Sequence, residues 1–259
     1  VLRLPSSLQR PEIVLPRGES ISLKFEPGLL TEVKRAAREH QVTEYSFLLA
    51  CYQILLHAYT GQDDIVVGTS ASARDNPRWA NVVGYFVNIL PMRCDLSGSP
   101  SFAEHLAHTR DTVLGAMSHQ EFPFSLMVSR LRLRRRPDRS PVFQTFFNFL
   151  TDRVGELGSL FLGVRDSSVE FGGSVLRPWM VVPQQEGQSE IVLQLSDVGG
   201  RLGGNLNYNS DVVDRKTAEA MAEDFREIVE AAAREVDAPI ASLLPGSRRS
   251  AAEREEIVL

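Results

Sequence analysis

The chain has 259 residues, of which 43% are hydrophobic and 24% are charged, and its formal net charge at pH 7 is -5. This composition is typical of a globular protein with a sizeable core, and the acidic balance excludes a globally cationic nucleic-acid binder. No apolar run is long enough to cross a bilayer, and prolines interrupt the N-terminal segment where a secretion signal would lie. Cys51 and Cys94 lie far apart in apolar surroundings, which predicts buried thiols in a reducing, cytoplasmic setting.

The first predicted elements are an extended segment, a strand and two helices. Residues 1–20 contain several prolines and show no helical period, which predicts a connector, and the alternation over 21–25 predicts a strand. Apolar residues at helical spacing predict an amphipathic helix over 29–40. Thr43 is a suitable N-cap for a second helix over 44–59, which is almost entirely apolar and therefore predicted to be buried.

The middle of the chain predicts two more strands and two more helices. The strands lie around 65–68 and within 82–93, and the next helix starts at a capping box, Ser101-x-x-Glu104. A short helix near 123–131 begins with a proline, which suits the first helical turn. We expect the longer of these helices to face the core with Phe102, Leu106, Val113 and Met117.

The last part of the chain predicts mainly strands, closed by one helix. A Phe-rich run over 142–150 predicts a buried strand, and two strands, 191–195 and 202–208, flank a Gly-Gly pair that is typical of a hairpin. Asp214 is a suitable N-cap for the final helix. This mixture, without strict β-α-β alternation, predicts an α/β (α+β) fold and not a Rossmann sheet.

The sequence contains no pattern that predicts a complete catalytic or metal site. The Cys-x-x-Cys, His-Glu-x-x-His, Walker A and Gly-x-Gly-x-x-Gly patterns are all absent, so no metal site is expected. His108 and Asp111 have the spacing of a base and its orienting acid, yet such pairs are common on helix surfaces. His119 lies at a predicted helix end, where it either caps the helix or has a chemical role.

A dense basic run interrupts this acidic chain. It predicts either a solvated loop or a docking surface for an anionic partner, whereas RNA binding would require interleaved aromatic residues. The run comprises Arg130, Arg132, Arg134, Arg135, Arg136 and Arg139.

Four segments occur in an order and spacing that are specific when they are taken together. The first is Thr60-Gly61-Gln62-Asp63-Asp64-Ile65-Val66-Val67-Gly68-Thr69, ending near Arg74, and the second is Val83-Gly84-Tyr85-Phe86-Val87-Asn88, continuing to Arg93. The third is His119-Gln120-Glu121-Phe122-Pro123-Phe124, and the fourth is Asp138-Arg139-Ser140-Pro141-Val142-Phe143-Gln144. They resemble the motifs of nonribosomal peptide synthetase condensation domains, with Glu121 and Val142 in place of the usual Asp and Leu.

The resemblance implies a single chloramphenicol-acetyltransferase-like lobe with a mixed central sheet flanked by helices. Members of the family have two such lobes, which enclose a tunnel, and two carrier proteins dock at its opposite ends. It implies that 21–246 is the C-terminal lobe, that 1–20 is the interlobe connector and that 247–259 is a linker toward an adenylation domain. The implied partners are the N-terminal lobe, donor and acceptor peptidyl carrier proteins and the adenylation domain, with no nucleic acid and no membrane. No covalently bound cofactor is implied, since the phosphopantetheine arms of the carrier proteins enter as substrates.

The resemblance also implies roles for the motif residues. The candidates on the tunnel or substrate side are Gly84, Phe86, Asn88 and Arg74, because glycine permits close approach of an arm and an Asn amide pairs with pantetheine amides. Alternatively, Gly84 marks a strand bend, Asn88 satisfies local backbone groups and Arg74 forms a structural ion pair. The motif residues expected to be structural are Arg93, His119, Gln120, Pro123, Phe124, Asp138, Ser140 and Gln144.

Three functions remain open from the sequence. The family's catalytic His-His-x-x-x-Asp-Gly motif belongs to the N-terminal lobe and is absent here, so no catalytic residue is expected in this chain. The chain is the second lobe of an amide-forming acyltransferase, or a module that docks carrier proteins or recruits another protein, or a small acyltransferase that oligomerises. We favour the first, because the chain starts with Val1 rather than Met at the expected connector. The third is disfavoured, because no histidine follows His119.

One further comparison with the family concerns the reaction subtype. The Phe-Val-Asn form at 86–88 implies a peptide-bond-forming member rather than an epimerising or heterocyclising relative. Ser189-Glu190-Ile191 departs from the Phe-Asp-Leu that the family often carries, which weakens the assignment of the subtype and leaves that of the family unchanged.

Overall fold

The computed structural model describes residues 1–5, 8–72, 74, 77–79, 81–133, 138–151, 168–177 and 189–245. The expected linker over 247–259 and three arginines of the basic run lie outside these residues. Within them, no helix is both long enough and apolar enough to span a membrane.

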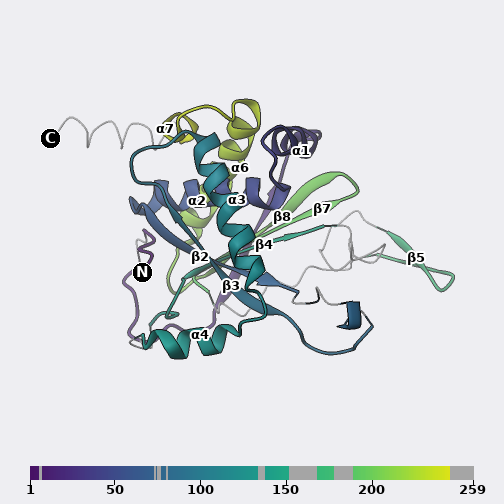
Figure 1. Ribbon diagram of the computed structural model, residues 1–259, viewed down its shortest axis with the longest axis horizontal. Helices are drawn as coiled ribbons and strands as arrows, with labels where there is room; N and C mark the ends of the chain where they lie inside the picture. The colour runs from purple at the N-terminus through teal and green to yellow at the C-terminus, as the bar shows by residue number, and fades with distance from the viewer. Residues whose placement is uncertain are drawn as a thin grey trace.

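A mixed sheet forms the centre of the described chain, with the strand order β1-β8-β7-β4-β2-β3 (Figure 1). Strand β4 runs parallel to both β2 and β7, and the other neighbours pair antiparallel. The predicted mixed sheet and α/β class are confirmed. The strands are β1 (Gly18–Lys24), β2 (Asp64–Ala71), β3 (Asn88–Asp95), β4 (Thr145–Leu150), β7 (Ile191–Val198) and β8 (Arg201–Asn209), with a separate hairpin of β5 (Val169–Phe171) and β6 (Ser174–Leu176).

Helices α1, α2 and α6 lie together on one side of the sheet, and α4 lies apart from them, at the lower edge of the view in Figure 1. Helix α3 packs against α2 and β3. The helices are α1 (Leu29–Glu39), α2 (Glu44–Thr60), α3 (Phe102–Ser118), α4 (Phe124–Leu131), α6 (Arg215–Arg234) and α7 (Ile240–Leu243), with one 3-10 turn at Pro77–Trp79.

Local capping residues explain where three helices begin. The side chains of Thr43 and Asp214 each accept a hydrogen bond from the backbone N–H three residues later, and Ser101 and Glu104 form the complete reciprocal capping box. Each bond satisfies an N–H group that has no partner within its own helix. The predicted starts of α2, α3 and α6 are therefore confirmed.

Two adjacent glycines form the turn between β7 and β8. Gly199 has φ of 58° and Gly200 has φ of 78°, which are left-handed values that side chains with a Cβ rarely adopt. A two-residue hairpin with positive φ at both central positions matches the right-handed twist of its strands. The predicted hairpin is confirmed.

Helix α2 supplies much of the core, as its apolar sequence predicts, and both cysteines are free and buried. The ring of Tyr52 lies 5.9 Å from that of Phe147 on β4 and 6.3 Å from that of Phe225 on α6, measured between ring centroids. The hydroxyl of Tyr59 donates to the Asp224 carboxylate at 2.7 Å. These contacts join α2 to the sheet on one side and to α6 on the other.

Three details of the predicted elements are corrected by the structure. Strand β1 begins at Gly18, inside the expected connector 1–20, because residues 18–20 already pair with β8. Met117 is 38% exposed and does not face the core, because the buried residues of α3 lie in its N-terminal half. The hairpin of β5 and β6 and the short helix α7 were not predicted from the sequence.

Candidate functional site

Arg74 organises the loop between β2 and β3. Its guanidinium donates to three backbone carbonyls, those of Trp79 at 2.5 Å, Val82 at 2.9 Å and Gly84 at 3.1 Å. The guanidinium also lies over the ring of Phe86, 4.1 Å from the ring centroid, which is a cation–π arrangement. The structure therefore brings together three of the four tunnel-side candidates, and among the described residues Arg74 binds carbonyls of the loop.

The loop presents large apolar side chains to solvent. Val83 is 101% exposed and Tyr85 is 88% exposed, although Phe86, between Arg74 and the Trp79 ring, is partly covered. A Cβ on Gly84 would approach the Phe86 ring to 3.2 Å, which is tighter than ordinary packing. The loop is thus held from within by its arginine while its outer side chains have no cover in the described chain.

Asn88, the fourth candidate, joins the Phe-Val-Asn segment to the segment before α4. Its amide nitrogen donates to the carbonyls of Gln120 and Phe122, both at 2.8 Å, and its amide oxygen accepts from the backbone N–H of Phe124 at 3.1 Å. Phe124 is the first residue of α4, so the Asn88 side chain satisfies one of its free N–H groups. Both amide hydrogens are occupied by backbone carbonyls.

Replacing Asn88 by alanine is expected to lower the free energy of unfolding by about 2 kcal/mol, because three partly exposed hydrogen bonds are lost. Asn88→Asp is expected to cost more, since a carboxylate oxygen would then face the carbonyls of Gln120 and Phe122. Urea denaturation measures both values. Asn148→Ala, which removes a single exposed bond to Ser70, is the control. An Asn88→Asp variant as stable as the wild type would contradict this arrangement.

The His119–Phe124 segment forms the turn between α3 and α4. His119 is the C-cap of α3 and is exposed, whereas Gln120 is buried and Pro123 is the N-cap of α4. Phe122 is 40% exposed, and its ring centroid lies 5.4 Å from the Arg130 guanidinium. Phe124 is partly buried against Phe143, with ring centroids 5.5 Å apart.

Arg93 forms a two-pronged ion pair across the edge of the sheet. Its guanidinium donates to both carboxylate oxygens of Asp64 on β2, at 2.7 and 3.0 Å. These hydrogen bonds lower the pKa of the Asp64 carboxyl from its ordinary value. Both side chains are well exposed, so the pair orients β2 and β3 more than it stabilises the fold.

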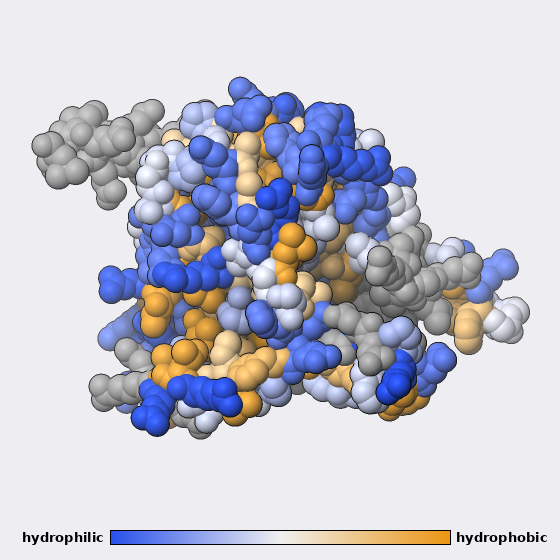
Figure 2. All heavy atoms as spheres, viewed as in Figure 1, coloured by the Kyte–Doolittle hydropathy of each residue, from blue (hydrophilic) through white to orange (hydrophobic). Residues whose placement is uncertain are grey.

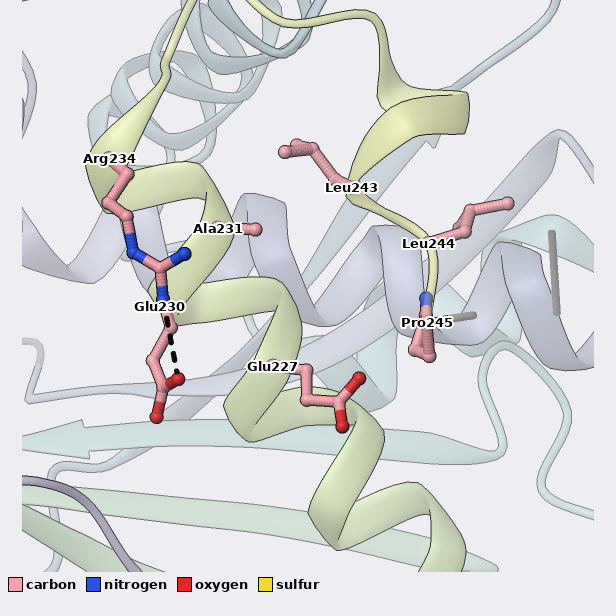
Figure 3. Close-up of a pocket in the computed structure, with 7 residues that line it drawn as sticks. All are labelled: Glu227, Glu230, Ala231, Arg234, Leu243, Leu244 and Pro245. Atoms are coloured by element: carbon pink, nitrogen blue, oxygen red, sulfur yellow. Dashed lines mark ion pairs between the residues drawn. The ribbon is translucent and has the colours of Figure 1, made fainter. Parts of the chain in front are cut away.

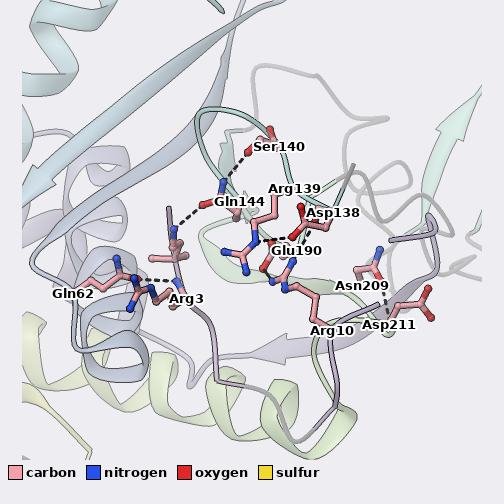
Figure 4. A network of polar contacts seen from close by, with 11 residues as sticks. Arg3, Arg10, Gln62, Asp138, Arg139, Ser140, Gln144, Glu190, Asn209 and Asp211 are labelled. Atoms are coloured by element: carbon pink, nitrogen blue, oxygen red, sulfur yellow. Dashed lines mark hydrogen bonds and ion pairs between the residues drawn. The ribbon is translucent and has the colours of Figure 1, made fainter. Parts of the chain in front are cut away.

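Gln144 holds the N-terminal segment against the sheet (Figure 4). Its side-chain oxygen accepts from the backbone N–H of Leu2 at 2.7 Å, and its amide donates to the carbonyl of Ser140 at 2.9 Å. Next to it, Arg10 donates to the carbonyl of Asp138 at 3.1 Å, and the Asp138 carboxylate pairs with Arg139. The fourth motif therefore lies beside the expected connector, which residues 1–5 and 8–17 form and which we call the strap.

Two residues of this region were not predicted from the sequence as members of a site. Glu190, noted only as a departure from the family pattern, pairs with Arg10 at 2.7 Å, and Asn209 donates to the carbonyl of Leu15 at 2.6 Å. The sequence contained one signal for this site, because Glu190 is a charged residue directly before the apolar run of β7. Such a position is ordinarily interpreted as a solvated turn.

The histidines that the sequence offered as catalytic candidates do not form the expected base–acid pair. Asp111, the candidate partner of His108, pairs with Arg110 at 2.9 Å. His105 is 1% exposed inside the core, and the ring of His57 lies 3.1 Å from the carbonyl of Gln62 and 3.3 Å from the Asp63 carboxylate in the turn after α2. No cluster of three or more His, Cys, Asp or Glu side chains in the described ranges is arranged to hold a metal ion.

A small open pocket lies between α6 and the end of α7, with a volume of about 280 Å³ (Figure 3). None of the motif residues lines it. Glu230 and Arg234 pair across one turn of α6 at 3.7 Å. The lining residues are Glu227, Glu230, Ala231, Arg234, Leu243, Leu244 and Pro245.

Apolar and basic side chains share the exposed face of α4. Figure 2 shows apolar residues along the lower edge of the molecule, over α4, with hydrophilic residues beside them. Leu126 is 41% and Leu131 is 52% exposed, and Arg130 and Arg132 are exposed on the same short element. Arg130 and Arg132 therefore lie beside an apolar surface, whereas Arg139 of the same run pairs with Asp138.

Comparisons with known proteins agree with these motifs. A linear gramicidin synthase of Brevibacillus parabrevis is 32% identical over 259 residues, which cover 100% of this chain and 5% of that protein. The condensation domain of the monacolin K polyketide synthase MokA has a TM-score of 0.76 and 22% identity, covering 93% of this chain and 55% of that chain. The X-domain in its complex with OxyB from teicoplanin biosynthesis has a TM-score of 0.77 and 23% identity, covering 93% and 51%.

The chain thus spans a small part of its curated relative and about half of two solved structures that share its fold. The profile of the family described as "Condensation domain" matches residues 1–254, nearly the whole chain. With its four motifs, its mixed sheet and this match, the chain belongs to the condensation domain family.

Proposed function

We propose that this chain is the C-terminal lobe of a condensation domain that joins carrier-bound aminoacyl or peptidyl thioesters in nonribosomal peptide synthesis. The observation that carries the proposal is the extent of the match. The chain equals about half of a solved condensation domain and lacks the catalytic His-His-x-x-x-Asp-Gly motif. One lobe of a two-lobed enzyme is expected to have this extent and to lack the catalytic histidine, which the other lobe carries.

In the proposed reaction, the amine nitrogen of the acceptor attacks the carbonyl carbon of the donor thioester. A carbon–nitrogen bond forms and the carbon–sulfur bond breaks, and the amine proton ends on the released pantetheine thiol. The base is assigned to the other lobe, because the His-His-x-x-x-Asp-Gly motif is absent from this chain. This lobe contributes surfaces that position the two arms.

Two surfaces support a role in binding partners. The Arg74-held loop exposes Val83 and Tyr85 almost fully, which suits burial against the N-terminal lobe. The exposed face of α4 combines leucines with Arg130 and Arg132, which suits an acidic carrier protein that also offers apolar side chains. Arg74 itself is engaged by three carbonyls, which favours loop positioning over phosphate binding.

A second candidate function is a module that recruits another protein without catalysis. The X-domain of teicoplanin biosynthesis shares this fold and forms a complex with OxyB. The same exposed loop and α4 face suit such recruitment. The two candidate functions differ in one testable respect. Only the lobe of an amide-forming domain produces an amide when the N-terminal lobe is joined to it.

The test is amide formation from loaded donor and acceptor carrier proteins, followed by mass spectrometry of the product. We expect no product with this chain alone and clear turnover when the N-terminal lobe is joined to it. Binding of carrier proteins or another protein by the joined domain without product would favour the recruitment module. Turnover by the chain alone would contradict both candidate functions and would make His119 and His108 candidate catalytic residues.

A further inference from the structure

Three buried polar residues lie side by side at one end of the sheet. Gln144 directly precedes β4, Glu190 directly precedes β7, and Asn209 ends β8. The backbone N–H of Glu190 donates to the Gln144 carbonyl at 2.8 Å, and that of Asn209 donates to the Glu190 carbonyl at 3.0 Å. They are 1%, 6% and 0% exposed, respectively, so each side chain requires a partner inside the protein.

Each of the three residues has a partner in the strap, and Figure 4 shows Glu190 beside Arg10. Gln144 accepts from the Leu2 N–H, Glu190 pairs with the Arg10 guanidinium, and Asn209 donates to the Leu15 carbonyl. The strap therefore crosses the end of three neighbouring strands before it turns into β1 at Gly18.

Further contacts secure both ends of the strap. At the start, the Leu2 side chain is 4% exposed within the core, and the Arg3 N–H donates to the Gln62 side chain at 2.7 Å. At the other end, the backbone N–H of Ser210 donates to the Arg17 carbonyl at 2.9 Å. Detaching the strap would remove a partner from each of the buried side chains of Gln144, Glu190 and Asn209, which makes detachment costly.

We infer that the row of Gln144, Glu190 and Asn209 clamps the strap as a fixed part of this lobe. The three residues are positioning residues that set where the chain enters from a preceding lobe, and that part of the inference rests on the proposed function. Relative movement of the two lobes is then confined to the chain before Leu2. Two of the three bonds are formed with backbone groups of the strap, so they depend little on the strap's own side chains.

The first test is amide hydrogen exchange at Leu2 in the 259-residue chain. We expect protection in the wild type and exchange about tenfold faster in Gln144→Ala, which removes the acceptor. Gln53→Ala is the matched control, because Gln53 is also 1% exposed but bonds to Thr109 in the helical layer. Unprotected exchange at Leu2 in the wild type would overturn the inference, and this measurement needs no variant. Equal acceleration of exchange at Leu2 in Gln144→Ala and Gln53→Ala would also overturn it.

The second test measures the distance between the lobes in the joined two-lobe protein. One spin label is placed at Leu114→Cys, a 62% exposed position on α3, and the other on the preceding lobe. We expect Asn209→Ala and Gln144→Ala to broaden the distance distribution and Gln53→Ala to leave it unchanged. Equal widths in all variants would refute the positioning role. Failure of the joined protein to form an amide would refute the proposed function but not the clamping of the strap. The clamping is tested separately by hydrogen exchange at Leu2.

Discussion

Arg10→Met is expected to lower the free energy of unfolding by about 3–5 kcal/mol, as measured by urea denaturation at neutral pH. The Glu190 side chain is 7% exposed and pairs with Arg10 at 2.7 Å. Among the described residues, the second carboxylate oxygen of Glu190 has no hydrogen-bond partner. Removing the guanidinium therefore leaves a buried carboxylate without its counter-charge, which is among the most costly single changes in a protein core.

The double variant Arg10→Met with Glu190→Gln is expected to recover most of that loss, because it leaves no buried charge. Glu190→Gln alone is expected to cost less than Arg10→Met, since the Arg10 side chain is 22% exposed and can be solvated. Arg215→Met is the control, because its pair with Glu219 is exposed and worth at most about 1 kcal/mol. Additive losses in the double variant would show that the two groups are not coupled.

Lowering the pH from 7 to 4 is expected to remove about 3 kcal/mol of stability through His105 alone. Burial lowers the pKa of this imidazole from 6.5 to about 4, with smaller contributions from the charges of His108 and His57. The unfolded chain takes up a proton as the pH falls below 6.5, whereas the folded protein keeps the ring neutral. The contribution is complete above pH 6.5 and is lost as the pH falls toward 4.

His105→Leu is expected to remove this part of the pH dependence, because leucine does not titrate and is stable in a buried position. The measurement is the difference in unfolding free energy between wild type and variant at pH 7, 5.5 and 4, which cancels the contributions of the carboxylates. His119→Leu, at an exposed position, is the control and should keep the full dependence. A constant difference between wild type and His105→Leu across this range would disprove a neutral buried ring.

The sequence identified the four motifs of the candidate site, but it identified neither their geometry nor the contribution of Glu190 and Asn209. The motif residues were recognised, yet the partners of Asn88 lie 32 to 36 residues further along the chain and could be identified only in the folded structure. Gln144 was expected to be structural, but its bond to Leu2 spans 142 positions. No local pattern reports contacts of that range, because they depend on which strands become neighbours.

The sequence by itself determined most of the elements, the starts of three helices and one hairpin turn. Thr43, Ser101 with Glu104, and Asp214 begin helices because a side-chain oxygen within three residues satisfies a free backbone N–H, which is a local interaction. The Gly-Gly turn of β7 and β8 is local as well, because its positive φ values are those that glycine readily adopts. Only the tertiary structure decided that β4 lies beside the hairpin of β7 and β8 and that Gln144, Glu190 and Asn209 form one row. The order of the strands depends on how the apolar faces of the sheet and the helices are buried together, which no local sequence reports. A buried carboxylate before an apolar strand, such as that of Glu190, also has the same local sequence as a solvated one.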